Sequence, residues 1–440
     1  MLFASLEFAS LLFATVALYW ATRSLRLRLG GLLIASFIFY GYRHAPSLAL
    51  LGGTIVVNYA AGRALERWRS RKLLGAAVVL NLAVLAWFKV SAAFATESPW
   101  LPLGISFFTF QVVGYLVDVA RGDVPAERSL LTFAVFKSFF AQLVAGPIVR
   151  ARDMLPQLHA VARFNARQFH QGLFLLLSGL FLKVAVADTL AQFADRAFAA
   201  PQAQSTVGAW LSLYAYSVQL LADFWGYSTM AVGMGALFGL VLPVNFETPY
   251  LARSLQDFWR RWHITLSGWF RDYLYVPLGG NRRHPHRNLF VVMVLAGLWH
   301  GVGLTFLAWG ALHGLWLLVE RAWTSHKGAT TALPAWLSNV LVFHGVALLW
   351  VLFNAKDLAT ALAFYDRLLL PPYTGESAIP ALWLVCLIGF ALFHHRLDGL
   401  MKKERFTKIP LRWQLALSLA MVLAVLGHGG ARLDFKYFVF

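Results

Sequence analysis

The sequence predicts an all-α membrane protein, a polytopic bundle of transmembrane helices, and three observations point to it. The chain of 440 residues is 59% hydrophobic and only 13% charged, which is too apolar for a water-soluble domain. Its mean hydropathy is +0.62. Apolar segments of about 17–25 residues recur along it, the length that a helix needs to cross about 30 Å of hydrocarbon. Because these segments are continuous rather than alternating, they indicate helices instead of strands.

We expect roughly 11–12 spans, together with re-entrant and interfacial helices, in one membrane domain over residues 1–440. The predicted spans cover residues 2–22, 29–42, 47–62, 73–90, 101–119, 168–188, 207–224, 288–303, 304–320, 336–353, 380–395 and 412–427. The first carries Glu7 and lacks a preceding basic region, so we take it for a transmembrane helix and not for a signal peptide. The apolar stretches 129–150 and 226–241 are predicted to be re-entrant or tilted segments buried in protein.

Basic loops set the predicted orientation. Clusters of arginine follow the first, third and fifth spans, whereas the alternate loops 42–46 and 91–100 hold only Arg43. The odd-numbered loops are therefore expected in the cytoplasm, and both termini outside. The net charge of +18 fits loops that face the anionic headgroups of a lipid bilayer, and we expect no nucleic acid as a partner. The single cysteine, Cys386, excludes an internal disulfide.

The stretch 252–288 holds seven arginines and two aspartates among many aromatic residues. One interpretation is an interfacial amphipathic helix with its Trp and Tyr side chains at the headgroups. The other is a binding site for the phosphates of a donor, because the guanidinium fork matches phosphate oxygens. The candidate phosphate-binding residues are Arg260, Arg261, Arg271 and Arg282.

Histidines in apolar surroundings are the candidate catalytic groups. His300 lies in GLWHG, and an ionisable ring at membrane depth marks a functional site by default. No acidic residue or cysteine occurs within ten residues of it, and HEXXH and CXXC are absent, so we expect no metal. Proton transfer by the imidazole remains. His263 lies beside Arg261 and Trp262 in the arginine-rich stretch, and His313, in WGALHGL, is either a second ring of the same cavity or a structural residue.

Two other mechanisms find no support in the motifs. No GXSXG elbow is present, which argues against a serine hydrolase of the α/β type. No GXXXXGK[ST] loop is present, which argues against an ATP-driven pump.

The segments DFWRRWHITLSGWFRDYLYVPLGGNR, AGLWHG and WGALHGL together resemble the membrane-bound O-acyltransferase (MBOAT) family. More narrowly, they are similar to the bacterial branch that holds the membrane subunits of alginate and peptidoglycan O-acetyltransferases. Further similar segments are LPLGISFFTFQVVGYLVDVARG, FFAQLVAGPIVRARDMLPQL, ADFWGYSTMAVGMGALFG and LPVNFETPYLARS. The resemblance covers most of residues 40–320. Where many relatives read DFSGYSDM, this chain has Trp225 and Thr229.

This resemblance implies a helical bundle in which a cytoplasmic cavity takes an acyl thioester and an outer funnel admits the acceptor. The family's near-invariant histidine falls on His300, and its second polar position on His263; Asp257, Trp299 and His313 would line or support the funnel. The donor implied is acetyl-CoA, as a substrate and with no bound cofactor. An SGNH-like acetyltransferase outside the membrane would complete the transfer to a polysaccharide, and the location would be the bacterial inner membrane.

The C-terminal tail, within residues 412–440, ends in FKYFVF. By resemblance to a related D-alanylation system, Tyr437 would carry the acetyl group as a phenyl ester to the outer partner. An aromatic anchor at the membrane surface is the other interpretation of this tail. For the whole chain, the alternative function is a transporter of an acyl donor or a lipid-linked sugar, since intramembrane histidines and re-entrant segments suit it equally.

Overall fold

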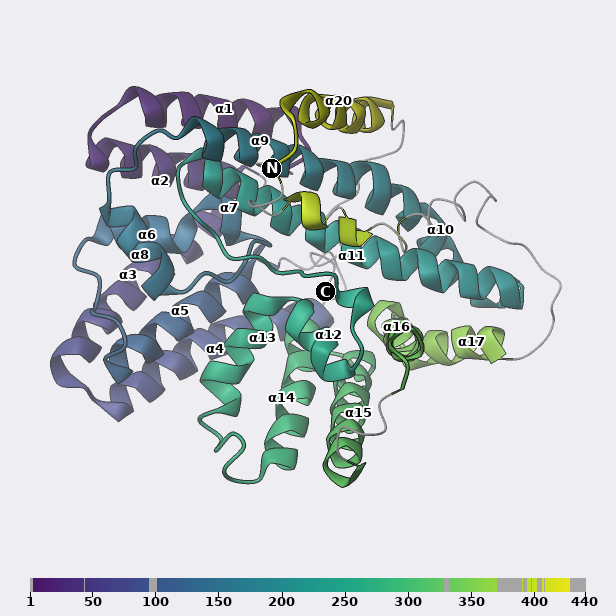
Figure 1. The fold of residues 1–440 in the computed structure, drawn as a ribbon. Coiled ribbons are helices and arrows are strands. Elements are labelled where there is room, and N and C mark those ends of the chain that lie inside the picture. Colours follow the sequence, from purple (N-terminus) through teal and green to yellow (C-terminus); the bar gives the residue numbers. More distant parts are fainter. Residues whose placement is uncertain are drawn as a thin grey trace. The chain divides into compact units, whose positions relative to one another are not determined.

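The computed structural model describes residues 3–42, 44–94, 101–327, 333–369, 390, 394–396, 398–401, 406 and 408–427. Within these ranges the regular structure is helical and contains no β-strand, so the predicted all-α class is confirmed (Figure 1). The chain forms two compact units, each assembled from two separate stretches. The first unit comprises residues 1–180 and 226–244, and the second comprises residues 181–225 and 245–440.

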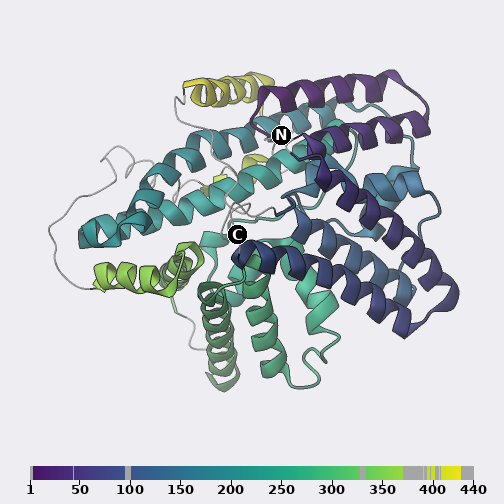
Figure 2. The ribbon, with the colours of Figure 1, turned by 180° about the vertical axis from the view of Figure 1, so that it is seen from behind.

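The first unit contains most of the N-terminal helices. They are α1 (Leu6–Ala21), α2 (Leu25–Gly41), α3 (Pro46–Trp68), α4 (Arg71–Phe94), α5 (Ile105–Arg121), α6 (Leu130–Ser138), α7 (Phe140–Leu143), α8 (Ala151–His159) and α9 (Ala166–Phe181). Ser5 and Ser24 cap the N-termini of α1 and α2, which lie side by side (Figures 1 and 2). As predicted for a segment buried in protein, residues 129–150 form the short buried helices α6 and α7, broken at Phe139.

The second unit begins where α9 ends. It contains the π-helix η1 (Leu182–Ala187), α10 (Asp188–Ala199), η2 (Pro201–Ala203), the first part of α11 (Thr206–Leu237), η3 (Pro249–Leu251), α12 (Leu255–Arg261), α13 (Ile264–Phe270), the π-helix η4 (Arg271–Tyr275), α14 (Pro285–His300), α15 (Leu304–Lys327), α16 (Ala335–Asn354), α17 (Leu358–Leu369) and α20 (Leu411–Gly427). Four helices among the described residues are long and apolar enough to cross a membrane. They are Pro46–Trp68, Arg71–Phe94, the continuous stretch Ala166–Ala199, and Ala335–Asn354.

The prediction for residues 226–241 is correct in that this stretch is mostly buried in protein, and wrong in its re-entrant form. Residues 226–241 do not form a separate re-entrant element, because α11 runs without a break to Leu237. The glycines that suggested irregular backbone instead allow α9 and α11 to pack closely. A Cβ atom at Gly179 would lie 2.5 Å from the Gly226 carbonyl oxygen, and one at Gly233 would lie 2.7 Å from the Gly172 carbonyl oxygen. Small residues at a helix contact have this effect in membrane proteins. Most of the predicted span 380–395 lies outside the described residues.

Candidate active site

His300 is the last residue of α14, and its side chain is buried, with 5% of the residue exposed. The helix ends there because Gly301 is extended (φ −162°), although its N–H still donates to the Gly297 carbonyl at 3.3 Å. Three aromatic rings surround the imidazole edge-on: Trp299 at 4.8 Å, Phe353 at 5.0 Å and Trp309 at 5.4 Å between ring centroids. The ring therefore lies in a setting of low polarity.

Two glycines allow α14 and α15 to pack closely beside His300. A Cβ atom at Gly297 would fall on the carbonyl oxygen of Phe306, and one at Gly301 would fall on the ring of the same residue. Neither position has room for a side chain. The two helices lie side by side in both ribbon views (Figures 1 and 2), so the GLWHG motif serves to bring the backbone of α15 against the end of α14.

His263 lies between the short helices α12 and α13, and only 1% of it is exposed. Its backbone is left-handed (φ 43°, ψ 54°), a conformation that costs a non-glycine residue free energy and clusters at functional sites. Asn245 fixes the turn: its carbonyl accepts from Ile264 N–H at 3.0 Å, and its Oδ1 accepts from the Thr265 hydroxyl at 2.6 Å. Burial lowers the pKa of His263 from 6.5 to about 3, which keeps the imidazole neutral at physiological pH.

An aromatic cluster joins the two histidines. We call Phe224, His263, Trp299 and His300 the histidine cluster. Phe224 lies edge-on to His263, with ring centroids 4.6 Å apart, and His263 lies 6.0 Å from Trp299. Trp299 in turn contacts His300, so its indole contacts both imidazoles. Three residues that the sequence singled out thus meet in the structure.

His313, on α15, is fully buried next to this cluster. Its ring lies 4.7 Å from Trp309 and 5.1 Å from Trp259, and neither ring nitrogen has a hydrogen-bond partner in the described part of the chain. A structural hydrogen-bonder, one of the two roles predicted for it, would make such a bond. Buried polar atoms are rarely left unsatisfied in proteins, so these nitrogens are free for a water molecule or a ligand.

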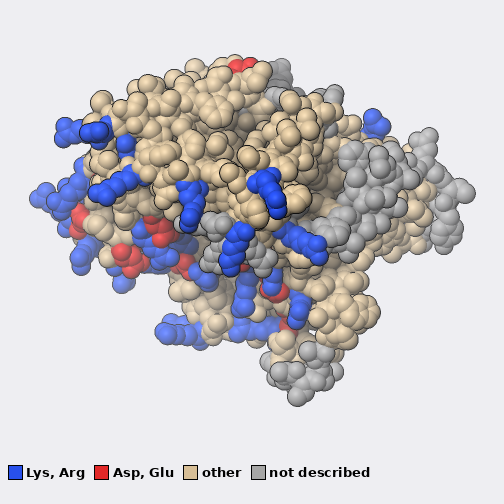
Figure 3. All heavy atoms as spheres, turned by 45° about the horizontal axis from the view of Figure 1, so that its top comes forward, with Lys and Arg blue, Asp and Glu red and all other residues tan. Residues whose placement is uncertain are grey.

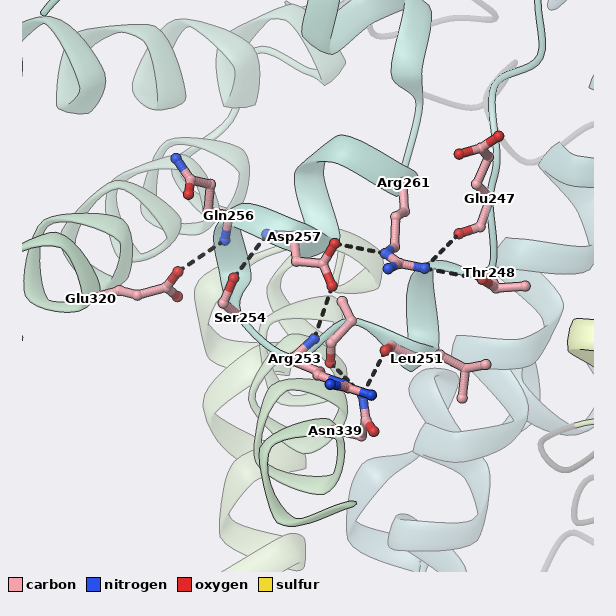
Figure 4. A network of polar contacts seen from close by, with 11 residues as sticks. Glu247, Thr248, Leu251, Arg253, Ser254, Gln256, Asp257, Arg261, Glu320 and Asn339 are labelled. Atoms are coloured by element: carbon pink, nitrogen blue, oxygen red, sulfur yellow. Dashed lines mark hydrogen bonds and ion pairs between the residues drawn. The ribbon is translucent and has the colours of Figure 1, made fainter. Parts of the chain in front are cut away.

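Asp257 and Arg261 form an ion pair on α12. Arg261 Nε donates to Asp257 Oδ1 at 2.7 Å, and Arg261 Nη1 donates to the Thr248 hydroxyl at 3.3 Å (Figure 4). Asp257 Oδ2 also accepts from the Arg253 N–H at 3.1 Å. The pair therefore fastens α12 to the segment around Thr248 that precedes it.

Two neighbouring helices anchor the start of α12. Glu320 on α15 accepts from the N–H groups of Leu255 and Gln256, at 2.7 and 3.3 Å. Asn339 on α16 donates to the Leu251 and Ala252 carbonyls, at 2.6 and 2.9 Å. Figure 4 shows the contacts of Glu320 with Gln256 and of Asn339 with Leu251. They fix the helix that leads into His263, and the sequence analysis assigned neither Glu320 nor Asn339 a role.

The other predicted phosphate-binding arginines lie at the surface. Arg260, Arg271 and Arg282 are exposed, and Arg271 forms a two-pronged contact with Asp272, at 2.7 and 3.3 Å. On the face drawn in Figure 3, Lys and Arg outnumber Asp and Glu. Tyr437, the predicted acyl carrier, lies outside the described residues. Among the residues that are described, no group of three His, Cys, Asp or Glu side chains is placed to hold a metal ion.

The second unit contains a buried ion cluster that was not predicted from the sequence. Lys183 Nζ lies 2.8 Å from both Asp188 Oδ1 and Asp223 Oδ1. A signal for it was present, because Lys183 falls inside the predicted span 168–188, and a charge within a span calls for a partner. The pair was not predicted because Lys183 and Asp188 are five residues apart, whereas residues on one face of an α-helix are three or four apart.

The arrangement suits proton transfer by an imidazole. A buried ring among aromatic side chains is shielded from water, which strengthens its electrostatic contacts with a reacting group. A second, neutral imidazole, that of His263, also contacts Trp299 and can donate and accept one hydrogen bond each. Such a pair of rings can serve as a general base and as a donor to a developing oxyanion.

Comparisons with known proteins indicate acyl transfer as the activity. The family model described as MBOAT, membrane-bound O-acyltransferase family, matches residues 64–356, a range that includes His263 and His300. The probable alginate O-acetylase AlgI of Pseudomonas aeruginosa is 42% identical over 372 residues, 77% of this chain and 69% of that protein. The peptidoglycan O-acetyltransferase of Helicobacter pylori is 38% identical over 377 residues, 75% of this chain and 72% of that protein. The teichoic acid D-alanyltransferase of Bacillus subtilis is 27% identical over 271 residues, 58% of this chain and 69% of that protein.

Proposed function

Because the chain belongs to the membrane-bound O-acyltransferase family, we propose a route by which this membrane O-acetyltransferase moves its acetyl group. The donor is acetyl-CoA in the cytoplasm, and the final acceptor is a polysaccharide outside the inner membrane. The observation that carries the proposal is the buried His300 ring at the end of α14, inside the segment that the family model matches. Relatives named for alginate and for peptidoglycan acetylation support a polysaccharide acceptor.

In this proposal His300 is the general base. Its neutral imidazole takes the proton of the acceptor hydroxyl while that oxygen attacks the thioester carbonyl carbon. The C–O bond forms, the C–S bond breaks, and the imidazolium returns the proton to the departing thiolate. His263 donates a hydrogen bond to the carbonyl oxygen as negative charge develops on it. The low pKa of His263 means that the ring is neutral at physiological pH, and a neutral imidazole still carries one N–H that can donate this bond.

The donor's phosphates bind at the arginine-rich surface on the cytoplasmic side. Arg260 and Arg282 are exposed and free of the Asp257 ion pair that engages Arg261. Arg271 contributes through a guanidinium that already contacts Asp272. The excess of basic loops on this side supports a cytoplasmic position, with both termini outside. The acceptor hydroxyl of this step is that of Tyr437 in the outer tail, which carries the acetyl group as a phenyl ester and passes it to an SGNH-like partner protein.

The experiment that tests the function uses the purified full-length chain in proteoliposomes with radiolabelled acetyl-CoA. We expect label on the protein, or on a polysaccharide acceptor supplied outside, and no label with His300→Ala. His286→Ala is the matched control, since His286 is exposed near the start of the same helix. A transporter without covalent chemistry would carry the donor into the lumen and leave both protein and acceptor unlabelled. That result would refute the proposal.

A further inference from the structure

Three charged side chains meet in the interior of the second unit. Lys183 Nζ lies 2.8 Å from Asp188 Oδ1 and 2.8 Å from Asp223 Oδ1, and none of these side chains is more than 4% exposed. We call these residues the lysine triad. Burying ionised groups in the protein interior costs solvation free energy, so we expect these three residues to have a function. The acyl-transfer steps proposed above use none of them.

A π-helix brings Lys183 and Asp188 together. In an α-helix, side chains five residues apart point about 140° away from each other. In η1 the N–H of Asp188 donates to the Lys183 carbonyl, which is the i→i+5 bond of a π-helix and places the two residues one turn apart. The ion pair and this backbone bond join the same two residues. The lysine triad therefore favours the π form of η1 over a regular α-helical form.

The third member ties η1 to the histidine cluster. Asp223 is followed on α11 by Phe224, whose ring lies edge-on to His263 at 4.6 Å. Phe224 also packs against Phe246 at 5.0 Å, so its position is fixed on two sides. Because consecutive residues on a helix move together, the contact of Lys183 with Asp223 sets the rotation of α11 that presents Phe224 to the imidazole.

Stability alone is a poor explanation for the lysine triad. Replacing a buried ion pair by apolar side chains of similar volume is often neutral or stabilising, whereas selection of one register is the best-attested use of buried charge. We propose that the lysine triad is a positioning device, which holds η1 in its π form and fixes α11 so that Phe224 orients the His263 ring for acyl transfer. This inference rests on the proposed role of His263.

The test is a double-mutant cycle on the reconstituted full-length chain. Asp223→Asn is made in the natural background and in a His263→Gln background, and kcat and the KM for acetyl-CoA are measured in both. We expect a loss in kcat of about tenfold with an unchanged KM in the natural background, and a further loss of less than about twofold where His263 is already replaced. Lys183→Arg, which keeps the charge, should restore most of the kcat that Lys183→Met loses.

Asp195→Asn is the matched control, because Asp195 is an exposed carboxylate on α10, the helix that begins with Asp188. It should leave kcat unchanged in both backgrounds. If Asp223→Asn fails to fold, Asp188→Asn, which retains the pair of Lys183 with Asp223, takes its place with the same expected non-additivity. Equal fold-losses in both backgrounds would overturn the inference.

A second measurement separates this inference from the proposed function. In protein labelled with ¹⁵N-histidine, the ring signal of His263, assigned by its loss in His263→Gln, should shift in Asp223→Asn and stay in place in Asp195→Asn. This readout needs no turnover, so it tests the inference even in a protein that transfers no acetyl group. An unmoved His263 signal in Asp223→Asn would show that the lysine triad does not position this ring.

Discussion

The indole of Trp299 lies 6.0 Å from the His263 ring and contacts the His300 ring at 4.8 Å, edge-on in both cases. One aromatic side chain therefore contacts both imidazoles to which the chemistry is assigned. Trp299 and His300 are consecutive at the end of α14, while His263 comes from a strained turn between two short helices. The contact between His263 and Trp299 therefore helps to hold the His263 turn and the end of α14 in place.

We predict that this contact is needed for turnover more than for folding. Trp299→Leu removes the aromatic wall of both imidazoles, and the resulting freedom of His300 should lower kcat roughly 10²-fold, as misplacement of catalytic groups does. Trp299→Phe keeps an aromatic ring and should retain most of the activity. Initial rates of acetyl transfer measure the effect, with size-exclusion profiles as the check on folding. Equal rates for both variants would contradict the prediction.

The two neighbouring arginines of α12 should behave differently. Arg260 is exposed, so Arg260→Gln should raise the KM for acetyl-CoA several-fold by removing one exposed charged contact, equivalent to about 1 kcal/mol. Arg261 is engaged by Asp257, so Arg261→Gln should mainly lower the stability, by about 0.5 kcal/mol for a pair whose side chains are 35% and 29% exposed. Donor titrations and thermal unfolding separate the two effects. A larger KM change for Arg261 than for Arg260 would speak against this division.

Gly297 should tolerate no side chain. A methyl group there would collide with the Phe306 carbonyl, and the backbone must then shift because no flexible side chain can move away. We expect Gly297→Ala to cost about 1–3 kcal/mol through overpacking and to separate α14 from α15. Gly75→Ala, on α4, is the control, since nothing lies within 4 Å of a Cβ atom there. Thermal unfolding in detergent measures both, and an unfolding temperature for Gly297→Ala equal to that of Gly75→Ala would refute the close contact.

The pH dependence of stability should carry a contribution from His263. Burial lowers the pKa of His263 to about 3 in the folded chain, against 6.5 for a free histidine, so the unfolded chain binds an extra proton between these values. The neutral ring therefore makes its full contribution to the free energy of unfolding above pH 6.5. This contribution is lost as the pH falls toward 3, by about 1.4 kcal/mol per pH unit at most. Unfolding temperatures of the natural chain and of His263→Gln, compared between pH 7.5 and 4.5, should converge or cross as the pH falls. A constant difference would argue against a buried neutral ring.

Much of this structure was accessible from the amino-acid sequence. Hydropathy located the long apolar helices, because a long apolar run has few other stable forms in lipid, but it did not predict the short helices α8, α12, α13 and α17. The position of His300 in a glycine-flanked apolar motif marked the candidate base, and the arginine-rich stretch led to His263. The glycines of residues 226–241 were misread, since glycine serves irregular backbone and close helix contacts alike, and only the partner helix α9 decides between them.

The remaining features depend on contacts between distant segments. A guanidinium fork fits a carboxylate as well as a phosphate, so the sequence did not indicate that Asp257 engages Arg261. Lys183 and Asp188 share a face only in a π-helix, which no periodic pattern announces, and their third partner, Asp223, comes from another helix. Glu320 and Asn339 act on the backbone of residues 251–256, and backbone contacts leave no trace in residue types.

The most direct test of the central claim replaces His300 by Gln, which approximates the size and the hydrogen bonding of the imidazole but cannot take up a proton near neutral pH. Transfer of radiolabelled acetyl from acetyl-CoA is followed in proteoliposomes that contain equal amounts of folded natural or variant chain. A general base contributes roughly 10²–10⁴ in rate, so we expect the initial rate of the variant to fall by at least about a hundredfold. A variant that transfers acetyl within a few-fold of the natural rate would contradict the assignment of His300 as the base.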